Sequence, residues 1–521
     1  MSNQCATRRG CSLQGVEKAD KISELAKRRG LFWPSCEIYG GISGFVTFGP
    51  LGTALKRKIE DKFREFYTRP LGILEIESSI ILPSKVFEAS GHVEHFKEPL
   101  AECTNCKRRF RADHLLQEQA KMSDTETEKL SLEELKREID EHNVRCPECG
   151  GVLGEPKYFV TMFTTTIGPY SDAVGYGRPE AAQSIFVEFR RLWELARERL
   201  PFGVVQIGHA LRNEISPRQG PIRLREFTIM DVEFFFDPEE PNCLQVKDVE
   251  NETLQLVRAE TKLKGEKTHT TVTVKEALQK GYIKAEWQAY FMALAKRFLR
   301  ELGVPNENQR FMEKLEWERA HYSTQSFDQE INLERWGWTE VSGHAYRTDY
   351  DLKKHMEASG VDMRAFKEGR RFIPHVVEPS FGSDRLAYVA VEFAYQAKRD
   401  RVVLSLPREL APVQVGVYPL VSKDGLPEKA MQLYQTLVKE SFMTEYDESG
   451  SIGRRYARAD EAGTPLGVTV DYDTLKDDAV TIRDRDSWKQ VRTPIDQLPD
   501  LLRDYFRHKK QFEDLGRLVK G

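Results

Sequence analysis

Residues 208–236, GHALRNEISPRQGPIRLREFTIMDVEFFF, constrain the fold of this chain more than any other stretch. Their pattern predicts two strands joined by a polar loop, Ile215–Pro221, because Ser, Pro and Gly residues interrupt both neighbouring patterns. Alternate side chains of a strand share a face. From Ile222 onward one face is therefore apolar and must cover a core. The other face carries Arg223, Arg225, Phe227, Asp231 and Glu233.

Two interpretations of that polar face are open from this stretch alone. A solvent-facing sheet with cross-strand ion pairs has the same pattern. Planar arginine forks, a stackable ring and carboxylates are also what a site for a nucleotide and a cationic group requires. On the preceding strand, Arg212 and Glu214 share a face as well.

Length and composition define the class of protein. A chain of 521 residues has room for about two to four domains, and 31% charged residues is typical of a soluble globular protein. No apolar run approaches the roughly 20 residues that span a bilayer. The first 21 residues lack the apolar core of a secretory signal. We therefore expect a cytoplasmic protein with no membrane association. With a net charge of −4, any nucleic-acid binding must use local basic patches.

Four of the eight cysteines form two CxxC pairs, which are Cys103 with Cys106 and Cys146 with Cys149. In a reducing compartment such pairs favour a metal over disulfides. Four thiolates are the number that a closed, structural Zn²⁺ site needs. Between the pairs, Ser131 and Glu134 predict a capping box at the start of a helix. We expect residues 100–155 to form a zinc-ribbon-like insertion.

The rest of the chain predicts an ordered series of helices and strands. Residues 53–67 predict an amphipathic helix, followed by a strand at 73–82. The highly charged residues 245–310 predict a helical insertion. A β-rich run at 372–377 is followed by residues 378–385, and the strand–turn–helix layout should put Glu378 and Ser380 at the end of the strand. Next comes a helix at 386–398, with Arg385 in its first turn, where an arginine opposes the helix dipole and suggests an anionic partner.

Two prolines between residues 405 and 412 mark a domain boundary. Beyond it, residues 406–521 alternate strands and helices, as in a small α/β domain. The run Arg454–Arg458 places Tyr456 among three arginines, which single-stranded RNA binding favours. Solvated surface charge explains that run equally well.

As a set, these motifs resemble class II aminoacyl-tRNA synthetases, and specifically the homodimeric type of glycyl-tRNA synthetase. The helix and strand ending at Pro83 resemble motif 1, residues 211–227 motif 2, and residues 378–385 motif 3. Residues 451–465 resemble that family's anticodon-binding domain. The glycyl-type context is found at residues 37–41, 90–92, 110–114 and 178–180.

The resemblance implies an α+β fold, with an antiparallel sheet flanked by helices over residues 1–405 and an anticodon-binding domain over 406–521. It also implies an ATP-dependent glycine–tRNA ligase. Such an enzyme makes glycyl-adenylate from glycine and ATP and transfers glycine to the 3′ end of tRNA(Gly). In the family motif 1 forms a dimer interface, so the resemblance implies a homodimer.

The resemblance assigns catalytic roles to Arg212, Arg385 and Glu340. Arg212 would hold the α-phosphate of ATP, and Glu340 a Mg²⁺ ion on the triphosphate. Arg385 would bind the γ-phosphate or sandwich the adenine ring, on which Phe227 would stack. Glu214 would lie near the adenine or the tRNA end. The other residues implied for the ATP site are Asn213, Arg223, Leu224 and Val341. Those implied for the glycine site are Glu180, Asp231, Glu378 and Ser380, with Arg111 nearby.

One position departs from the family, which usually has glutamate where this chain has Asp231. The shorter side chain predicts an ammonium contact that is longer, water-mediated or passed to Glu233. Two alternative functions are a non-enzymatic paralogue that binds nucleic acid and a synthetase for serine, threonine or proline. The presence of the motif arginines and pocket acids disfavours the first, and the number of acids disfavours the second.

Overall fold

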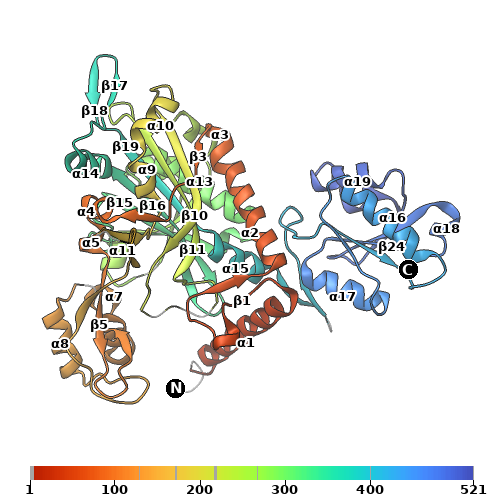
Figure 1. Cartoon of the computed structure of the whole chain (residues 1–521), viewed down its shortest axis with the longest axis horizontal. Coiled ribbons are helices and arrows are strands. Elements are labelled where there is room, and N and C mark those ends of the chain that lie inside the picture. Colours follow the sequence, from red (N-terminus) through yellow and green to blue (C-terminus); the bar gives the residue numbers. More distant parts are fainter. Residues whose placement is uncertain are drawn as a thin grey trace.

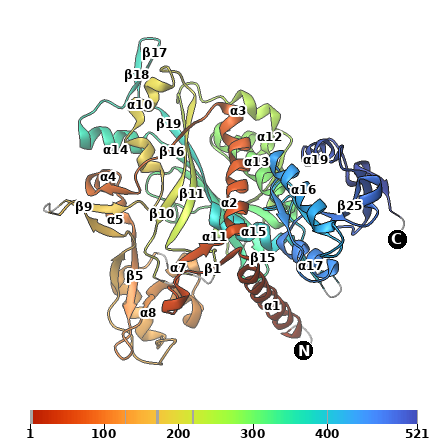
Figure 2. The same ribbon diagram turned by 45° about the vertical axis from the view of Figure 1, so that its right-hand side comes forward.

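The computed structural model describes residues 5–127, 129–169, 173–215, 217, 220–266, 268–398 and 401–519, without the side chains of residues 5–16, 124 and 125. Figure 1 shows a large body built on one extended sheet and a smaller C-terminal body beside it. The segment with the two CxxC pairs projects from the large body, as Figure 2 also shows. In the 208–236 stretch, Ser216, Arg218 and Gln219 lie outside the described residues.

The large body is organised on a nine-stranded sheet of order β13-β12-β14-β15-β16-β19-β11-β10-β3. All neighbours are antiparallel except β3 with β10 and β12 with β14. This confirms the expected antiparallel-rich fold. The strands are β3 (Leu74–Ile76), β10 (Phe202–Leu211), β11 (Glu226–Phe236), β12 (Thr253–Val257), β13 (Thr270–Thr273), β14 (Gln309–Glu313), β15 (Gln325–Leu333), β16 (Gly337–Thr348) and β19 (His375–Gly382).

Helices cover one face of this sheet, and on the opposite face they cover only one end. On the first face, the apolar side of β11 (Met230, Val232 and Phe234) belongs to one core with α2 (Pro50–Phe63), α13 (Glu286–Glu301) and α15 (Ser383–Ala394). A second core on the opposite face contains α9 (Ala182–Phe186), α10 (Phe189–Leu195) and α14 (Tyr350–Ser359). Beyond these three helices, polar side chains of the strands border a cavity.

The 208–236 stretch forms the predicted strand pair with a longer loop. β10 ends at Leu211 and β11 begins at Glu226, four residues later than predicted. Arg225 holds the intervening loop outside the ladder, because its guanidinium donates to the carbonyl oxygens of Glu214 and Ser43. Asp231 and Glu233 are 0% exposed. A solvent-facing sheet is therefore excluded.

Two predicted boundaries around the site are wrong. The strand predicted at 73–82 is two short strands, because the chain passes from β3 in the main sheet to β4 (Ile81–Pro83), which pairs with β9 (Val174–Gly177) in another sheet. The strand predicted at 372–377 is β19, which continues to Gly382, so Glu378 lies within it and Ser380 near its end, and α15 starts directly after it. That helix ends at Ala394, and residues 395–398 form strand β20 (Tyr395–Lys398).

Residues 245–310 are built into the main core rather than inserted between its strands. They supply two edge strands, β12 and β13, and the helix α13, most of whose side chains between Trp287 and Leu299 are buried. The high charge of the segment is misleading, since alternate residues such as Leu254, Leu256 and Val272 are turned into the core. The segment also contains α11 (Ala259–Leu263) and α12 (Val274–Gln279).

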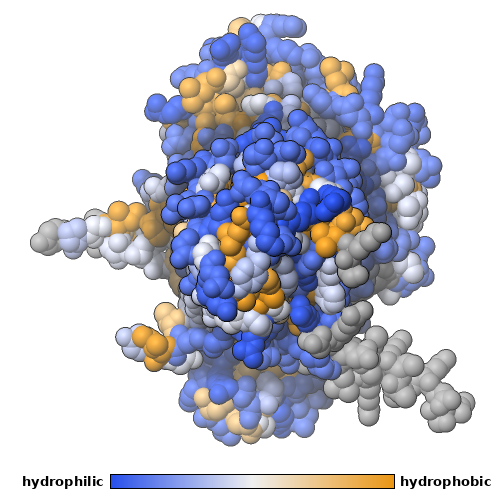
Figure 3. Space-filling model, turned by 90° about the vertical axis from the view of Figure 1, so that its right-hand side faces the viewer, coloured by the Kyte–Doolittle hydropathy of each residue, from blue (hydrophilic) through white to orange (hydrophobic). Residues whose placement is uncertain are grey.

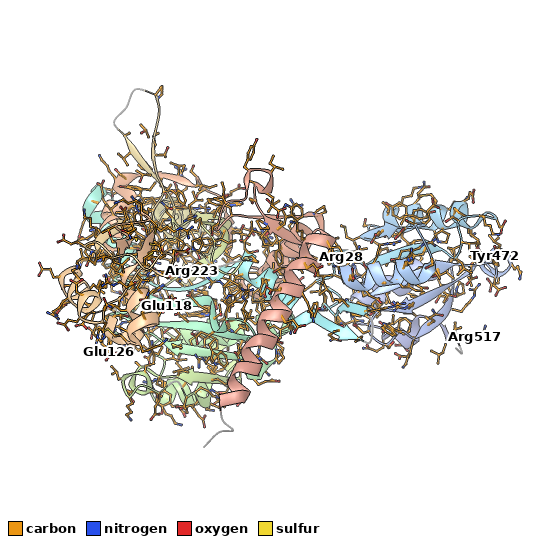
Figure 4. All side chains as sticks on the ribbon, turned by 90° about the horizontal axis from the view of Figure 1, so that it is seen from below. Arg28, Glu118, Glu126, Arg223, Tyr472 and Arg517 are labelled. Carbon is orange, nitrogen blue, oxygen red and sulfur yellow. The ribbon has the colours of Figure 1, made fainter. Side chains whose placement is uncertain are left out.

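The C-terminal body has its own six-stranded sheet, of order β23-β22-β24-β25-β26-β27, and its own core. Arg28 and Arg29, at the end of α1 (Cys5–Arg29), pair with Glu461 across the junction, where Figure 4 labels Arg28. Seen from its own side, this body presents a mainly hydrophilic surface (Figure 3). Its elements are β22 (Val415–Pro419), α16 (Leu426–Lys439), β23 (Thr444–Tyr446), α17 (Ile452–Ala462), β24 (Leu466–Val470), α18 (Thr474–Asp477), β25 (Ala479–Asp484), β26 (Gln490–Pro494), α19 (Leu498–Phe506) and β27 (Arg517–Leu518). Among the helices that the structure describes, none combines the length and apolar character needed to cross a membrane.

The predicted RNA-binding run in α17 is largely structural. Arg455 is 1% exposed, and its guanidinium donates to the carbonyl oxygens of Pro419, Glu448 and Gly450. The Tyr456 hydroxyl is bonded to Thr469 inside the domain. The RNA-binding interpretation is therefore wrong for these two residues. Of the three arginines in this run, only Arg454 is as exposed as RNA binding would require.

We expect Arg455→Ala to destabilise the C-terminal domain by about 2–4 kcal/mol, because it leaves three carbonyl oxygens without their charged donor. Differential scanning calorimetry would measure this as an earlier unfolding transition. Arg454→Ala, one residue away and exposed, is the matched control and should change stability by less than about 0.5 kcal/mol. Equal stability of the two variants would contradict the structural role.

Candidate active site

A cavity of about 520 Å³ lies over β11, β16 and β19 on the face that the helices leave uncovered. This volume is within the range of small-molecule sites. Figure 4 labels Arg223, one of its lining residues, among the side chains of the large body. The lining includes these residues predicted for the site: Glu180, Arg212, Glu214, Arg223, Leu224, Phe227, Glu340, Val341, Glu378, Ser380 and Arg385.

One half of the cavity combines arginines with aromatic rings. The Arg212 guanidinium lies 5.5 Å from the centre of the Phe227 ring and 5.8 Å from that of Phe96. Its Nε donates to the Pro179 carbonyl oxygen at 3.0 Å, which fixes the side chain. Arg223 approaches Glu214 at 3.9 Å. Such an arrangement suits a planar base and an anionic group.

Arg385 and Glu340 form the adjoining wall. Arg385, in the first turn of α15 as predicted, donates to the carbonyl oxygens of Ile222 and Glu340. The Glu340 side chain is exposed to the cavity from β16, where partial desolvation disfavours its charge, but Lys314 and then Arg385 outweigh this effect and lower the pKa of the carboxyl. The Glu340 side chain is therefore ionised and lines the same cavity as the arginines.

The other half of the cavity is an acidic cluster around Arg347. This guanidinium is 0% exposed and donates to Asp351 at 2.8 and 2.9 Å, to Glu378 at 2.9 Å and to Glu180 at 3.4 Å. The Tyr322 ring lies 3.6 Å from it, and the Tyr322 hydroxyl donates to Glu180 at 3.3 Å. Burial alone would raise the pKa of Glu180. Its neighbours His92 and Arg347 instead hold that pKa well below its usual value.

Asp231 lies behind the cavity wall rather than on it. Its carboxylate accepts the Ala181 backbone N–H at 2.7 Å and the hydroxyl proton of Ser380. Burial raises the pKa of Asp231 to about 6, although these two hydrogen bonds oppose the shift. Ser380 lines the cavity and Asp231 does not. The aspartate therefore reaches the cavity only through the serine hydroxyl.

Besides Asp231, two further predicted residues are not brought into the cavity. Arg111 is held by Glu98 at 2.6 Å and by Asp113, and it lines a neighbouring cavity instead of the acidic cluster. The structure thus separates it from the other residues predicted for glycine. Asn213 is fixed by its backbone N–H, which donates to the Thr161 carbonyl oxygen at 2.6 Å, and it is outside the lining.

Three members of the acidic cluster were missed by sequence reasoning: Tyr322, Arg347 and Asp351. For Arg347 and Asp351 the sequence does carry one signal, because residues four apart can form an ion pair within one helical turn. It carries none for Tyr322. Nothing in the sequence places Glu180 and Glu378 beside that pair, since they come from distant elements.

The four cysteines of the CxxC pairs come together as predicted. Their Sγ atoms all lie within 4.8 Å of one another, with Cys103 to Cys149 at 3.5 Å and Cys106 to Cys146 at 3.6 Å. A tetrahedral ZnS₄ site with ~2.3 Å bonds requires sulfur separations of ~3.8 Å. The cysteines therefore fit a zinc ion with only small shifts of their side chains. All four positions are protein ligands, as in a structural site.

The insertion around the cysteines has a small core of its own, which includes Leu115, Leu135 and Ile139. Its sheet pairs β5 (Lys97–Glu102) with β6 (Arg109–Arg111) and β7 (Lys157–Val160). The predicted capping box of Ser131 and Glu134 opens α8 (Leu132–Glu141). So small a core suggests that a metal stabilises the insertion.

We expect the purified protein to contain about one zinc per chain, because four thiolates converge on one point. Inductively coupled plasma mass spectrometry would measure it. Cys149→Ser should lower the zinc content and make the insertion sensitive to limited proteolysis. Ser substitution of Cys36, a cysteine outside the cluster, should leave both unchanged. A protein that carries no metal and whose four cluster thiols are free to titrate, in addition to those of the other four cysteines, would contradict the site.

Comparisons with known proteins agree with this geometry. The family described as "Anticodon binding domain" matches residues 414–505. The chain is similar to proteins named "Glycine--tRNA ligase". It is 45% identical to that of Aeropyrum pernix, over 96% of this chain and 99% of the relative, and 42% identical to that of Methanocaldococcus jannaschii, over 93% and 98%. A solved structure of Giardia lamblia prolyl-tRNA synthetase in complex with prolyl-adenylate shares the fold, with a TM-score of 0.58 at 14% identity over 93% of this chain and 75% of that one. Similarity at this level over nearly the whole of both sequences shows that the chain belongs to the glycine–tRNA ligase family.

Proposed function

We propose that this protein activates glycine with ATP and transfers the glycyl group to the 3′ end of tRNA(Gly). One observation carries the proposal: a closed acidic cluster, suited to an ammonium group, adjoins an arginine and aromatic wall, suited to a nucleotide, in one cavity. The two halves would bring the glycine carboxylate to the α-phosphate. Catalysis then depends on positioning and charge neutralisation, with no nucleophilic side chain.

In the nucleotide half, Phe227 would stack on adenine, and Arg385 would cover the ring or bind the γ-phosphate. Arg212 would neutralise the α-phosphate, where negative charge grows during attack. Glu214, Arg223, Leu224 and Val341 would complete the pocket, with Asn213 behind it. Glu340 fits a Mg²⁺ ion, because its ionised carboxylate faces the same space. When bound, Mg²⁺ would supply charge neutralisation on the triphosphate.

In the acidic half, Glu180, Glu378 and Ser380 would bind the glycine ammonium, and Asp231 would act through Ser380. Glycine has no side chain to bind, so selectivity must come from excluding larger amino acids. The Tyr322 ring, fixed against Arg347 and Glu180, is a rigid part of the wall. A filled pocket rejects a larger side chain by steric clash, which makes editing unnecessary.

The tRNA would reach the cavity from the side of the zinc-binding insertion. A second cavity, of about 1010 Å³, shares Lys314, Trp317 and Asp328 with the first. Its wall also carries Lys97 and Tyr158 from the insertion. The exposed rings of Trp317 and Tyr158 suit stacking with a single-stranded RNA end, and the cations of this wall alternate with acids such as Glu98 and Glu266. The C-terminal domain would contact the anticodon, in line with the family that it matches.

We also propose a cytoplasmic homodimer. Ile80 and Ile81, in the segment that resembles motif 1, are 38% and 41% exposed. A second copy of the chain would cover them.

Two alternative functions have less support. A non-enzymatic paralogue has no need of a preserved cavity with Arg212, Arg385 and the buried acids. A ligase for serine, threonine or proline would need space for a side chain beside the acidic cluster, and there Tyr322 lies against Arg347.

We expect glycine-dependent exchange between pyrophosphate and ATP, and none with the other nineteen amino acids. Arg212→Ala should lower the exchange by about 10²–10³-fold, because one donor to the developing charge is lost. Ala substitution of Arg199, an exposed arginine outside the cavity, should have no effect. Near-normal exchange in Arg212→Ala, or exchange with another amino acid, would refute the assignment.

We also expect Gly343→Ala to obstruct the cavity without unfolding the protein. Gly343 pairs with Ser380 and lines the cavity, and a Cβ added there would meet no atom within 4 Å. The methyl group would therefore project into the space for substrate. The Michaelis constant for glycine or for ATP should rise by about tenfold or more, with the thermal midpoint shifted by less than about 3 °C. Unchanged constants would place the substrate elsewhere.

A further inference from the structure

The acidic cluster contains more carboxyl groups than its cations neutralise. Five of them, Glu180, Asp231, Glu233, Asp351 and Glu378, are buried together. The cation in direct contact with three of them is Arg347. A buried carboxylate without a partner is so costly that it takes up a proton instead. Some of these five must therefore be neutral while the site is empty.

The hydrogen bonds distinguish the charged members from the neutral ones. Asp351 accepts two hydrogen bonds from Arg347 and one from Gln183. Glu180 accepts from Tyr322, Gln183 and Arg347. Within the described part of the chain, Glu378 accepts a single hydrogen bond, from Arg347. Neither oxygen of Glu233 has a partner among the described residues, although its side chain is 0% exposed.

Strand register places Glu233 beside Glu378. β11 and β19 pair at Asp231 with Ser380 and at Phe234 with Val377, so Glu233 lies opposite Glu378 between these two points. Directly opposite residues of antiparallel strands have Cβ atoms about 5 Å apart. Glu378 lines the cavity and Glu233 does not. One carboxyl group thus lines the cavity, with a second beside it on the neighbouring strand, buried outside the cavity lining.

The surroundings of Glu233 and Glu378 favour the protonated form of both carboxyl groups. Burial, opposed by Arg347 and reinforced by Glu180 and Asp231, raises the pKa of Glu378 to about 8. Burial and then Glu378 raise the pKa of Glu233 well above its usual value. The groups that interact with the pair are Arg347 on β16, Asp351 on α14, Asp231 on β11, Glu180 before α9 and Tyr322 before β15. Three further groups act on these neighbours instead: Arg178 on Asp231, His92 of α5 (His92–His95) on Glu180, and His355, which responds to Asp351.

We propose that the amino-acid pocket exchanges a proton for the ammonium group of its substrate. In the empty pocket Glu233 and Glu378 each hold a proton. Binding of the glycine ammonium expels the Glu378 proton, while Glu233 keeps its own. This inference rests on the proposed function and adds two assignments to it: Glu378 carries the exchanged proton, and Glu233 is a positioning residue that stays neutral beside it.

The exchange balances in atoms and charge. One O–H bond of Glu378 breaks, its proton leaves through the cavity to solvent, and the resulting carboxylate faces the incoming –NH₃⁺ group. The net charge of the cluster is the same before and after binding. The empty pocket therefore has no additional unpaired carboxylate, and in the occupied pocket the ammonium group is paired with the Glu378 carboxylate.

The exchange makes binding depend on pH in a defined direction. Below the pKa of Glu378 in the empty pocket, binding must remove a proton, so affinity falls as pH falls. Between pH ~6.5 and ~7.5 the dissociation constant of a ligand with an ammonium group should decrease by up to about tenfold. A ligand without the ammonium group should lack this dependence.

The test is isothermal titration calorimetry near pH ~7 in buffers of different ionisation enthalpy, which counts the protons released. The ligand is 5′-O-(glycylsulfamoyl)adenosine, a stable analogue of the adenylate. The matched ligand is its acetyl counterpart, which lacks only the amino group. We expect about one proton released with the first ligand and close to none with the second.

Two isosteric variants assign the protons. Glu378→Gln should release close to none and bind the glycyl analogue at least about tenfold more weakly, because the carboxylate partner is gone. Glu233→Gln, which mimics the neutral acid, should still release about one.

Equal proton counts for the two ligands would overturn the exchange. Proton release that persists in Glu378→Gln but disappears in Glu233→Gln would overturn the assignment of the exchanged proton to Glu378. Binding of neither ligand, with no glycine-dependent exchange of pyrophosphate, would refute the proposed function and this inference with it.

Discussion

The buried guanidinium of Arg347 is the interaction on which the site depends. It connects β16 to α14 through Asp351, to β19 through Glu378 and to the segment before α9 through Glu180. Without it, these largely buried acids would repel one another with little water to screen them. Removing one partner from a buried ion pair costs about 3–5 kcal/mol. The same side chain therefore joins separate parts of the fold and keeps the acids in place for an ammonium group.

Strand geometry then divides the cavity into its two halves. Side chains alternate along β11, so Met230 and Val232 enter the core while Phe227 faces the cavity. The antiparallel partner β19 places Glu378 and Ser380 on the same face, and Phe381 in the core. Alternation thus separates the core side from the cavity side. The two ends of the cavity follow from position along the strands, since Phe227 lies near the start of β11, whereas Ser380 of β19 pairs with Asp231 further along.

The parts of the site that follow a two-residue period were predictable from the sequence, and those that depend on distant partners were not. Phe227, Glu378 and Ser380 belong to the first kind. Arg347 belongs to the second, because its partner Glu180 is 167 residues away. Arg455 shows the converse error. A run of cations resembles a solvated surface, yet α17 directs this arginine onto carbonyl oxygens that only the fold supplies.

Asp231 shows how the site accommodates a side chain one methylene shorter than the family's usual glutamate. Ser380 donates its only hydroxyl proton to Asp231, and the Ala181 N–H holds the other carboxylate oxygen. With its proton committed, the serine oxygen has only lone pairs left for the cavity. It therefore presents an acceptor, which suits an ammonium group and disfavours another acceptor. The negative charge of Asp231 strengthens that oxygen through the hydrogen bond. In this way a carboxylate behind the wall would contribute to the proposed ammonium binding without reaching the cavity.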